Sequence, residues 1–293
     1  QPRSRGLGDV YKRQLLLLLA LSPWLAGCQS SKHMPHLIAL FTDFGPSDPY
    51  VGQLKGAIKT ISPTAEILDL SHANAAFDIS AASYLLAKST RTLPTGSIVI
   101  AVVDPGVGSS RAGLAVRTQA GRIYLAPDNG ILTEVLAREG VSEARTLSPA
   151  TDSVSATFHA RDIFGPTAAR LVNSGSFEST GPKAEKILRL PRNTATVMTS
   201  LAKGQVLFVD HYGNILTNIP GSELGKLKVG QLLSLTIKGK SLSLPYLRTY
   251  ADAPANRPFA LINSDGEFEI AINQGNAARE LGIKAGDPVV LKL

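Results

Sequence analysis

The sequence predicts an α/β fold in two parts: an N-terminal, mostly parallel sheet flanked by helices, and a smaller C-terminal β-rich domain. Apolar strand-like runs alternate with helical periodicity up to about Pro191, and short strands separated by turn residues follow. The chain of 293 residues is long enough for two modest hydrophobic cores. Its hydrophobic content of 44% and charged content of 18% are typical of a globular protein.

Strands and helices alternate through the N-terminal part. Five apolar or β-branched runs predict strands: Leu37–Phe41, Glu66–Leu70, Ser97–Val103, Gly113–Arg117 and Arg122–Ala126. Four segments with apolar residues at helical spacing predict helices: Val51–Ile61, Ile79–Ala87, Ile131–Ala137 and Ile163–Val172. This alternation favours a largely parallel sheet covered by helices on both faces.

The spacing of the strands changes after Pro191. Four short strands are expected in the C-terminal part: Val206–Val209, Leu233–Ile237, Phe259–Ile262 and Phe268–Ile272. Asp265-Gly266, between the last two, is a strong hairpin turn signal. We therefore expect an α/β domain over residues 36–195, a linker near Pro191–Ser200 and a β-rich domain over residues 200–293.

Residues 1–35 are expected to form a leader and a tether outside the fold. Lys12 and Arg13 precede a short apolar stretch, and the sequence Leu-Ala-Gly-Cys then ends at Cys28, the only cysteine of the chain. This order is typical of a bacterial lipoprotein signal with a lipidated cysteine. It predicts an exported protein anchored in the membrane by lipid on the periplasmic side. The alternatives are an ordinary signal peptide and, if the leader misleads, a cytoplasmic protein.

Several classes of function are not indicated. The formal net charge is +7, part of which lies in the leader, and no basic stripe with interleaved aromatic residues points to nucleic acid. The chain has no P-loop, no complete dinucleotide-binding glycine motif, no His-Glu-x-x-His helix and no Gly-x-Ser-x-Gly elbow. We expect no metal, no cofactor and no nucleic-acid partner.

Two aspartates occupy the positions at which open α/β sheets bind ligands. Asp43 and Asp104 each follow an apolar strand directly and enter a turn, and such sheets bind ligands beyond the carboxyl ends of their strands. Four segments therefore stand out: Thr42–Gly45, Val103–Gly108 with Arg111 after it, Thr157–Pro166 and Asp210–Asn214. Each has a structural alternative, because an aspartate in a turn often caps its own backbone and a lone histidine is usually structural.

Together these segments resemble the S-adenosylmethionine (SAM) hydrolase, or SAM hydroxide adenosyltransferase, family, which is related to the fluorinases and chlorinases. The resemblance covers nearly all of residues 37–293 and rests on Thr-Asp-Phe-Gly, Asp-Pro-Gly-Val-Gly and Phe-His-x-Arg-Asp-x-Phe-x-Pro in this order. It implies hydrolysis of SAM to adenosine and L-methionine by attack of water or hydroxide at the ribose 5′ carbon. It also implies a homotrimer with active sites between subunits, and SAM as substrate rather than cofactor.

The resemblance assigns a role to particular residues. Asp104, Arg111 and His159 correspond to the set that handles water. The implied substrate contacts are Asp43, Phe77, Phe158, Asp210, Tyr212, Asn214 and Ser264. Among these, Asp43 holds the ribose hydroxyls, Phe77 walls the ribose, and Asp210 meets the methionine ammonium. Tyr212 and Asn214 hold the adenine side, and the segment with Ser264 contacts the methionine carboxylate.

The chemistry is consistent with these residue types. The sulfonium of SAM makes methionine a good leaving group, so the protein must only orient a water molecule and accept its proton. A carboxylate at Asp104 repels halide, which favours water as the nucleophile. The alternatives are a SAM-dependent halogenase and an exported lipoprotein that binds SAM or adenosine without turnover. Ala160, where the family usually has glycine, and Asp265, where halogenating relatives have arginine, depart from the pattern.

Overall fold

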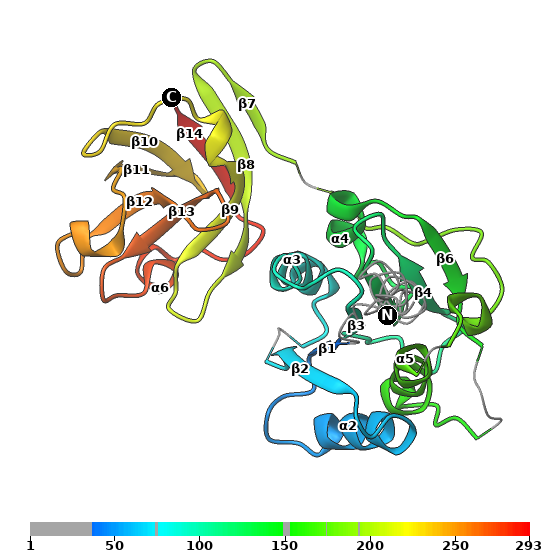
Figure 1. Cartoon of the computed structure of the whole chain (residues 1–293). Coiled ribbons are helices and arrows are strands. Elements are labelled where there is room, and N and C mark those ends of the chain that lie inside the picture. The colour runs from blue at the N-terminus through cyan, green and yellow to red at the C-terminus, as the bar shows by residue number, and fades with distance from the viewer. Residues whose placement is uncertain (1–36, 74–75, 149–152, 174, 193) are drawn as a thin grey trace, which may run out of the picture. The chain divides into compact units, whose positions relative to one another are not determined.

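The computed structural model describes residues 37–73, 76–148, 153–173, 175–192 and 194–293 (Figure 1). These residues form two sheets, one in the first half of the chain and one in the last third. The predicted α/β class with a C-terminal β-rich part is therefore confirmed. Within the described ranges, no helix is long and apolar enough to cross a membrane. The predicted leader and Cys28 lie outside the described residues.

The first sheet has six strands in the order β2-β1-β3-β5-β4-β6. Its strands are β1 (Leu37–Thr42), β2 (Glu66–Ser71), β3 (Ile98–Val102), β4 (Gly113–Arg117), β5 (Ile123–Pro127) and β6 (Glu143–Thr146). The pairs β1–β2, β1–β3 and β3–β5 are parallel, as expected. The strand β4 instead pairs antiparallel with β5 and β6. A turn at Thr118–Arg122 joins β4 to β5, and so short a connection allows only antiparallel pairing.

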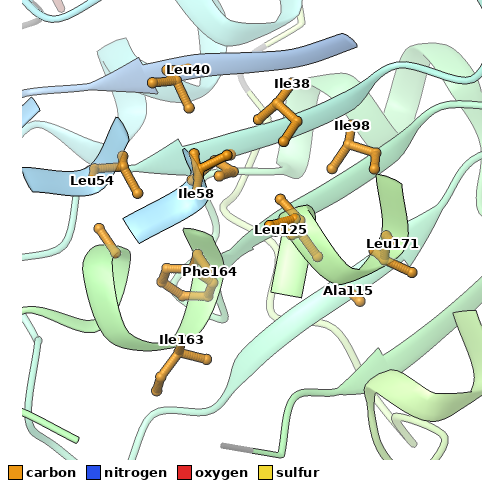
Figure 2. Close-up of a cluster of buried hydrophobic side chains, with 14 of the residues drawn as sticks. Ile38, Leu40, Leu54, Ile58, Ile98, Ala115, Leu125, Ile163, Phe164 and Leu171 are labelled. Atoms are coloured by element: carbon orange, nitrogen blue, oxygen red, sulfur yellow. The ribbon is translucent and has the colours of Figure 1, made fainter. Parts of the chain in front are cut away.

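Two pairs of helices cover the two faces of this sheet. The helices are α2 (Tyr50–Ile61), α3 (Ile79–Ser89), α4 (Thr133–Glu139) and α5 (Gly165–Val172). In β1, Ile38 and Leu40 pack with α2 and α5, whereas Ala39 and Phe41 pack on the opposite face with α3 and α4. Figure 2 shows the first of these cores, with Leu54 of α2 and Phe164 among its members. Burying each large apolar side chain contributes about 1.5–3 kcal/mol.

The predicted helix Ile163–Val172 begins differently in the structure. A π-helical turn covers Ala160–Phe164, and α5 starts at Gly165, whose N–H donates to the carbonyl of Ala160. A side chain at Gly165 would place its Cβ 2.8 Å from Leu54 Cδ1, so glycine allows this turn to pack against α2. π-Helical turns are frequent at functional sites, and His159 lies directly before this one.

The second sheet is antiparallel and has eight strands. Its order is β11-β10-β14-β8-β9-β13-β12, and β7 pairs with β8. The strands are β7 (Thr196–Met198), β8 (Leu201–Val209), β9 (Ile215–Pro220), β10 (Leu232–Ile237), β11 (Lys240–Pro245), β12 (Pro258–Ile262), β13 (Glu267–Ile272) and β14 (Pro288–Lys292). A short helix, α6 (Ala277–Leu281), packs on its core. The four predicted strands correspond to β8, β10, β12 and β13, and the Asp265-Gly266 turn joins the last two.

Short 3₁₀ helices complete the described chain. They span Phe177–Thr180, Gly221–Glu223 and Tyr250–Asp252. The last of them lies between β11 and β12 and begins with Tyr250. Sequence periodicity gives no indication of this turn because three residues are too few to show a period.

Candidate active site

The ends of β1 and β3 bring two aspartates together. Thr42 and Val102 are paired in register on adjacent parallel strands, so Asp43 and Asp104 emerge at the same edge of the sheet. Both line a small cavity of about 110 Å³. The other residues lining it are Phe44, Phe77, Val102, Val107, Thr157, Phe158, His159 and Ala160. Five residues with a predicted role, Asp43, Phe77, Asp104, Phe158 and His159, therefore lie around one cavity.

Arg111 connects Asp104 to His159. Its Nε donates to Asp104 Oδ1 at 3.1 Å, and its Nη2 donates to Asp104 Oδ2. The same Nη2 lies 2.9 Å from His159 Nδ1. Because a guanidinium can only donate, Nδ1 must accept, and the proton of the neutral imidazole then sits on Nε2. The side chains of Asp104 and Arg111 are only 4% and 10% exposed, so solvent screens this pair little.

The environment of His159 favours the neutral imidazole. Burial lowers the pKa of His159, and the positive charge of Arg111 lowers it further. The carboxylates of Asp104 and Asp162 act in the opposite direction without reversing the shift. The neutral form required by the Arg111 contact is therefore the form present at neutral pH.

A tight turn returns the chain from Asp104 to Arg111. The N–H of Val107 donates to the carbonyl of Asp104 at 3.2 Å. Gly108 has φ +81°, and a Cβ there would lie 2.6 Å from the carbonyl oxygen of Ala156. Only glycine fits this conformation and this close approach, so the Asp-Pro-Gly-Val-Gly sequence has a direct structural reason.

A hydrogen bond links Asp43 to Phe77, and both residues line the cavity. The N–H of Phe77 donates to Asp43 Oδ2 at 3.2 Å. Phe77 has φ +68°, which is strained for an aromatic residue, and its side chain is 73% exposed. Strained residues held by their surroundings cluster at ligand-binding sites. An aromatic side chain left in solvent is also suited to cover a ligand.

Two aromatic rings line this cavity, and a third ring packs against them. Phe44 and Phe158 line it, and their ring centroids are 5.7 Å apart in an edge-to-face arrangement. Tyr50 contacts both rings, with centroid distances of 6.1 and 5.6 Å. Sequence analysis gave Tyr50 no role, because the predicted helix began one residue later, at Val51.

A larger pocket of about 610 Å³ lies in the C-terminal sheet. It is lined by Asp210, Tyr212, Asn214, Tyr250, Ile272, Asn273, Gln274, Gly275, Asn276 and Arg279. Asp210, Tyr212 and Asn214 thus share one pocket, which leaves Ser264 as the one predicted C-terminal contact outside it. The backbone N–H groups of Tyr212 and Asn214 donate to Asp210 Oδ1 at 2.9 and 2.8 Å, which fixes the carboxylate. The Asn214 side chain also donates to Asp210 Oδ2 at 2.9 Å.

A buried glutamate supports this pocket. Glu269 is 3% exposed and accepts a 2.6 Å hydrogen bond from the Tyr250 hydroxyl and a 3.2 Å bond from Asn263 Nδ2. Burial raises the pKa of Glu269, although both hydrogen bonds act to lower it. Sequence analysis missed Tyr250 and Glu269, because no motif or local period marks either of them. Ser264 is exposed and lines neither pocket, so its role stays a prediction.

Metal ligands do not gather anywhere in the described parts of the chain. Among those residues, no group of three or more His, Cys, Asp or Glu side chains is placed to hold a metal ion. The ionisable groups around the smaller cavity are instead arranged as a carboxylate, a guanidinium and an imidazole, hydrogen-bonded in that order. On an α/β sheet edge, this arrangement defines an enzyme site that can orient a nucleophile and take its proton.

Comparison with known proteins identifies the family. The N-terminal domain model of the SAM hydroxide adenosyltransferases matches residues 38–181, and the C-terminal domain model matches residues 204–290. The protein belongs to the SAM hydroxide adenosyltransferase family.

Known relatives match this chain over most of their own length. A protein of Thermus thermophilus named (R)-S-adenosyl-L-methionine hydrolase is 34% identical, over 87% of this chain and 98% of its own. A fluorinase of Nocardia brasiliensis is 27% identical, over 88% of this chain and 97% of its own. The crystal structure of an uncharacterized conserved protein from Thermotoga maritima matches with a TM-score of 0.83 and 32% identity, covering 87% of this chain and 99% of that one.

Proposed function

We propose that this protein hydrolyses SAM to adenosine and L-methionine by attack of water at the ribose 5′ carbon. The observation that carries the proposal is the hydrogen-bonded set of Asp104, Arg111 and His159 beside Asp43. The relatives named (R)-S-adenosyl-L-methionine hydrolase, which match this chain over nearly their whole length, support it.

In the proposed reaction, water attacks in line with the C5′–sulfur bond. The new bond joins the water oxygen to C5′, and the electron pair of the broken bond stays on sulfur, which leaves as the neutral thioether of methionine. The protein must hold the water about 3–3.5 Å from C5′. Positive charge on the sulfonium makes the leaving group good, so placement and proton removal are the remaining tasks.

Asp104 is the group suited to accept the proton of the water. The Nδ1 of His159 already accepts from Arg111, and its Nε2 carries a proton, so His159 has no free acceptor. The Nε2–H is instead suited to donate to the water oxygen and fix its orientation. The Asp104 carboxylate has further lone pairs beyond those used by Arg111. Such positioned acid–base groups typically contribute about 10²–10⁴-fold in rate.

The remaining residues of the small cavity fit the ribose. A single carboxylate can accept hydrogen bonds from both hydroxyls of a vicinal diol, and Asp43 is the carboxylate placed beside Asp104. Phe77 and Phe158 supply apolar walls. In the same proposal, Asp210 binds the methionine ammonium, Ser264 lies near the methionine carboxylate, and the aromatic and amide groups of the larger pocket hold adenine.

The working enzyme in this proposal is a homotrimer in which the small cavity of one subunit meets the large pocket of a neighbour. A cavity of about 110 Å³ is too small for SAM alone, because ligand pockets usually measure about 300–1,000 Å³. Phe77 and Tyr212 are each 73% exposed at their pockets, and assembly would cover such rings. Light scattering coupled to size-exclusion chromatography measures the mass, and a monomer with full activity would contradict this assembly.

The proposal places the protein outside the cytoplasm, with a lipid on Cys28. Only the order of residues in the leader supports this location. Mass spectrometry of the N-terminus with and without globomycin tests it. An unlipidated N-terminus in globomycin-free cells would contradict the anchor.

A product assay tests the reaction itself. Purified protein incubated with SAM should release adenosine and methionine in equal amounts, and Asp104→Asn should reduce the rate about 10²–10⁴-fold. Formation of a 5′-halo-adenosine with added chloride or fluoride would show a halogenase instead, the activity named for the fluorinase relatives. The Asp104 carboxylate favours water, because it repels an anion at the attacking position. Binding of SAM without products would reduce the protein to a binding role.

A further inference from the structure

We propose that His72 is a positioning residue for Asp43, and that it sets the affinity for the ribose diol without touching the substrate. This inference rests on the proposed function, in which Asp43 binds the ribose hydroxyls. His72 follows β2 and is not among the residues that line the small cavity. Two of its contacts lead to the turn that carries Asp43.

His72 holds this turn at both ends. At the start of the turn, its Nδ1 shares a 2.8 Å hydrogen bond with Thr42 Oγ1. At the end of the turn, its carbonyl oxygen accepts from the N–H of Gly45 at 2.7 Å. Inside the turn, the N–H of Phe44 donates to Thr42 Oγ1 at 3.3 Å. Asp43 lies between these anchors, so the orientation of its carboxylate depends on the same contacts.

The imidazole of His72 also contacts Asp69 of β2. Its Nε2 lies 3.1 Å from Asp69 Oδ1 on β2, and the imidazole is 11% exposed. This approach lacks hydrogen-bond geometry, and Nε2 has no hydrogen-bond partner among the described residues. Asp69 Oδ2 accepts from Lys55 Nζ of α2 at 2.6 Å. Burial acts to raise the pKa of Asp69, but the hydrogen bond from Lys55 and the adjacent His72 imidazole prevail and lower it.

These contacts form one continuous chain of polar groups. It runs from Lys55 through Asp69 and His72 to Thr42, and thus joins α2, β2 and the end of β1. Asp43 follows Thr42 directly. Within this network the His72 imidazole is 11% exposed, whereas Lys55 and Asp69 are 36% and 42% exposed, so the side chains are most restricted at the His72–Thr42 end. Groups that touch a substrate need such support, because small displacements of a binding carboxylate weaken its hydrogen bonds.

The two nitrogens of His72 can be tested separately. His72→Asn keeps a polar group at the position of Nδ1 and can still bond Thr42, whereas His72→Gln reaches toward Asp69 and loses Thr42. The readout is the ratio of dissociation constants for 2′-deoxyadenosine and adenosine, measured by calorimetry. In the unaltered protein, we expect adenosine to bind about tenfold more tightly, because Asp43 accepts from the 2′-hydroxyl. His72→Gln should reduce this ratio to about 1–3, and His72→Asn should largely restore it.

Steady-state kinetics provide a second readout. With SAM as substrate, His72→Gln should raise KM about tenfold and leave kcat within about threefold, because a contact made equally in ground and transition states affects KM. Loss of folded enzyme would lower kcat and leave KM unchanged. Ser62→Ala is a matched control, since it removes a 2.7 Å hydrogen bond to Asn173 in the same part of the chain, away from the cavity. It should leave the adenosine ratio unchanged.

Asp43→Ala separates failure of this inference from failure of the proposed function. If Asp43→Ala leaves the adenosine ratio unchanged, the proposed ribose contact is wrong and the role of His72 falls with it. If Asp43→Ala abolishes the ratio while His72→Gln does not change it, only the role of His72 is overturned. The double variant should match Asp43→Ala alone, and an additional loss would show that His72 acts independently. Because adenosine binding requires no turnover, the result stands even if SAM is not hydrolysed.

Discussion

Replacing Arg111 by methionine removes the cation from the centre of the site while keeping a side chain of similar length. Four hydrogen bonds disappear: two to Asp104, one to His159 Nδ1 and a 3.5 Å bond to the carbonyl of Ala112. Asp104 is then buried without its partner, and His159 loses the donor that fixes its tautomer. The change therefore acts on stability, on rate and on the protonation of His159.

The size of the stability effect follows from burial. With side-chain exposures of 10% for Arg111 and 4% for Asp104, the pair belongs to the buried class. Removing one partner of a buried ion pair typically costs about 3–5 kcal/mol. We expect a loss of this size in the free energy of unfolding near neutral pH, and a fall in kcat of about 10²–10⁴-fold, because the proposed base, Asp104, is no longer held.

The protonation of His159 gives a sharper measurement. Arg111 contributes to the lowered pKa of His159, whereas Asp104 acts to raise it. Removing the arginine must therefore raise the pKa of His159, and the imidazolium would then pair with Asp104. We expect the histidine resonances of Arg111→Met to titrate at a higher pH than in the unaltered protein, by nuclear magnetic resonance. The pH at which the rate falls on the acid side should also move to a higher value.

Two results would refute this reasoning. A loss of less than about 1 kcal/mol would mean that the pair behaves like an exposed one. A pKa of His159 that falls or stays constant would mean that Arg111 does not donate to Nδ1. Arg111→Lys is the matched control, because it keeps the charge but cannot make the two-pronged contact. The pKa of His159 should therefore shift little in this variant, while the rate still falls.

Three further predictions concern His159 in the unaltered protein, Glu269 and Gly108. In the unaltered protein, kcat/KM should fall only below the ordinary histidine pKa of 6.5, because the pKa of His159 is lowered; an acid limb above that pH would contradict the neutral imidazole. The pKa of Glu269 is higher in the folded protein than the ordinary value of 4.5 that it has in the unfolded chain. As pH rises past 4.5, the unfolded chain therefore loses this proton before the folded protein does, and the stability of the folded protein falls. Glu269→Gln keeps an acceptor for Tyr250 and should gain stability relative to the unaltered protein between pH 4 and 7 by denaturant titration; a constant difference would exclude the effect. Gly108→Ala should cost more than about 1–2 kcal/mol, since a Cβ would meet the Ala156 carbonyl at 2.6 Å in a left-handed backbone; unchanged thermal stability would show that the turn relaxes freely.

The sequence predicted the part of the site that follows from strand order. Asp43 and Asp104 were found because each ends an apolar run, and parallel neighbours bring such ends to one edge. Gly108 belongs to the same predictable class, since the glycine marks a turn. The contacts of Arg111 with His159, 48 positions apart, could be expected only from family resemblance.

The parts that sequence analysis missed depend on distant pairing. Tyr250 reaches the larger pocket from a three-residue turn, and Glu269 supports it from β13 with its side chain on the buried face. Neither position has a local pattern that differs from an ordinary strand or loop. The strands β6, β7, β9, β11 and β14 were also missed. In β9 and β14 a proline argues against a strand within a sheet.

The separation of the two pockets along the chain has a consequence for how this family diversifies. Every group proposed to act on the nucleophile comes from residues before 165, and the larger pocket is built entirely from residues after 209. Mutations that exchange one attacking species for another can therefore accumulate in the first part of the gene without disturbing recognition encoded in the second. Hydrolases and fluorinases among the relatives match this chain along its whole folded length, as expected if descent altered the nucleophile and retained the architecture.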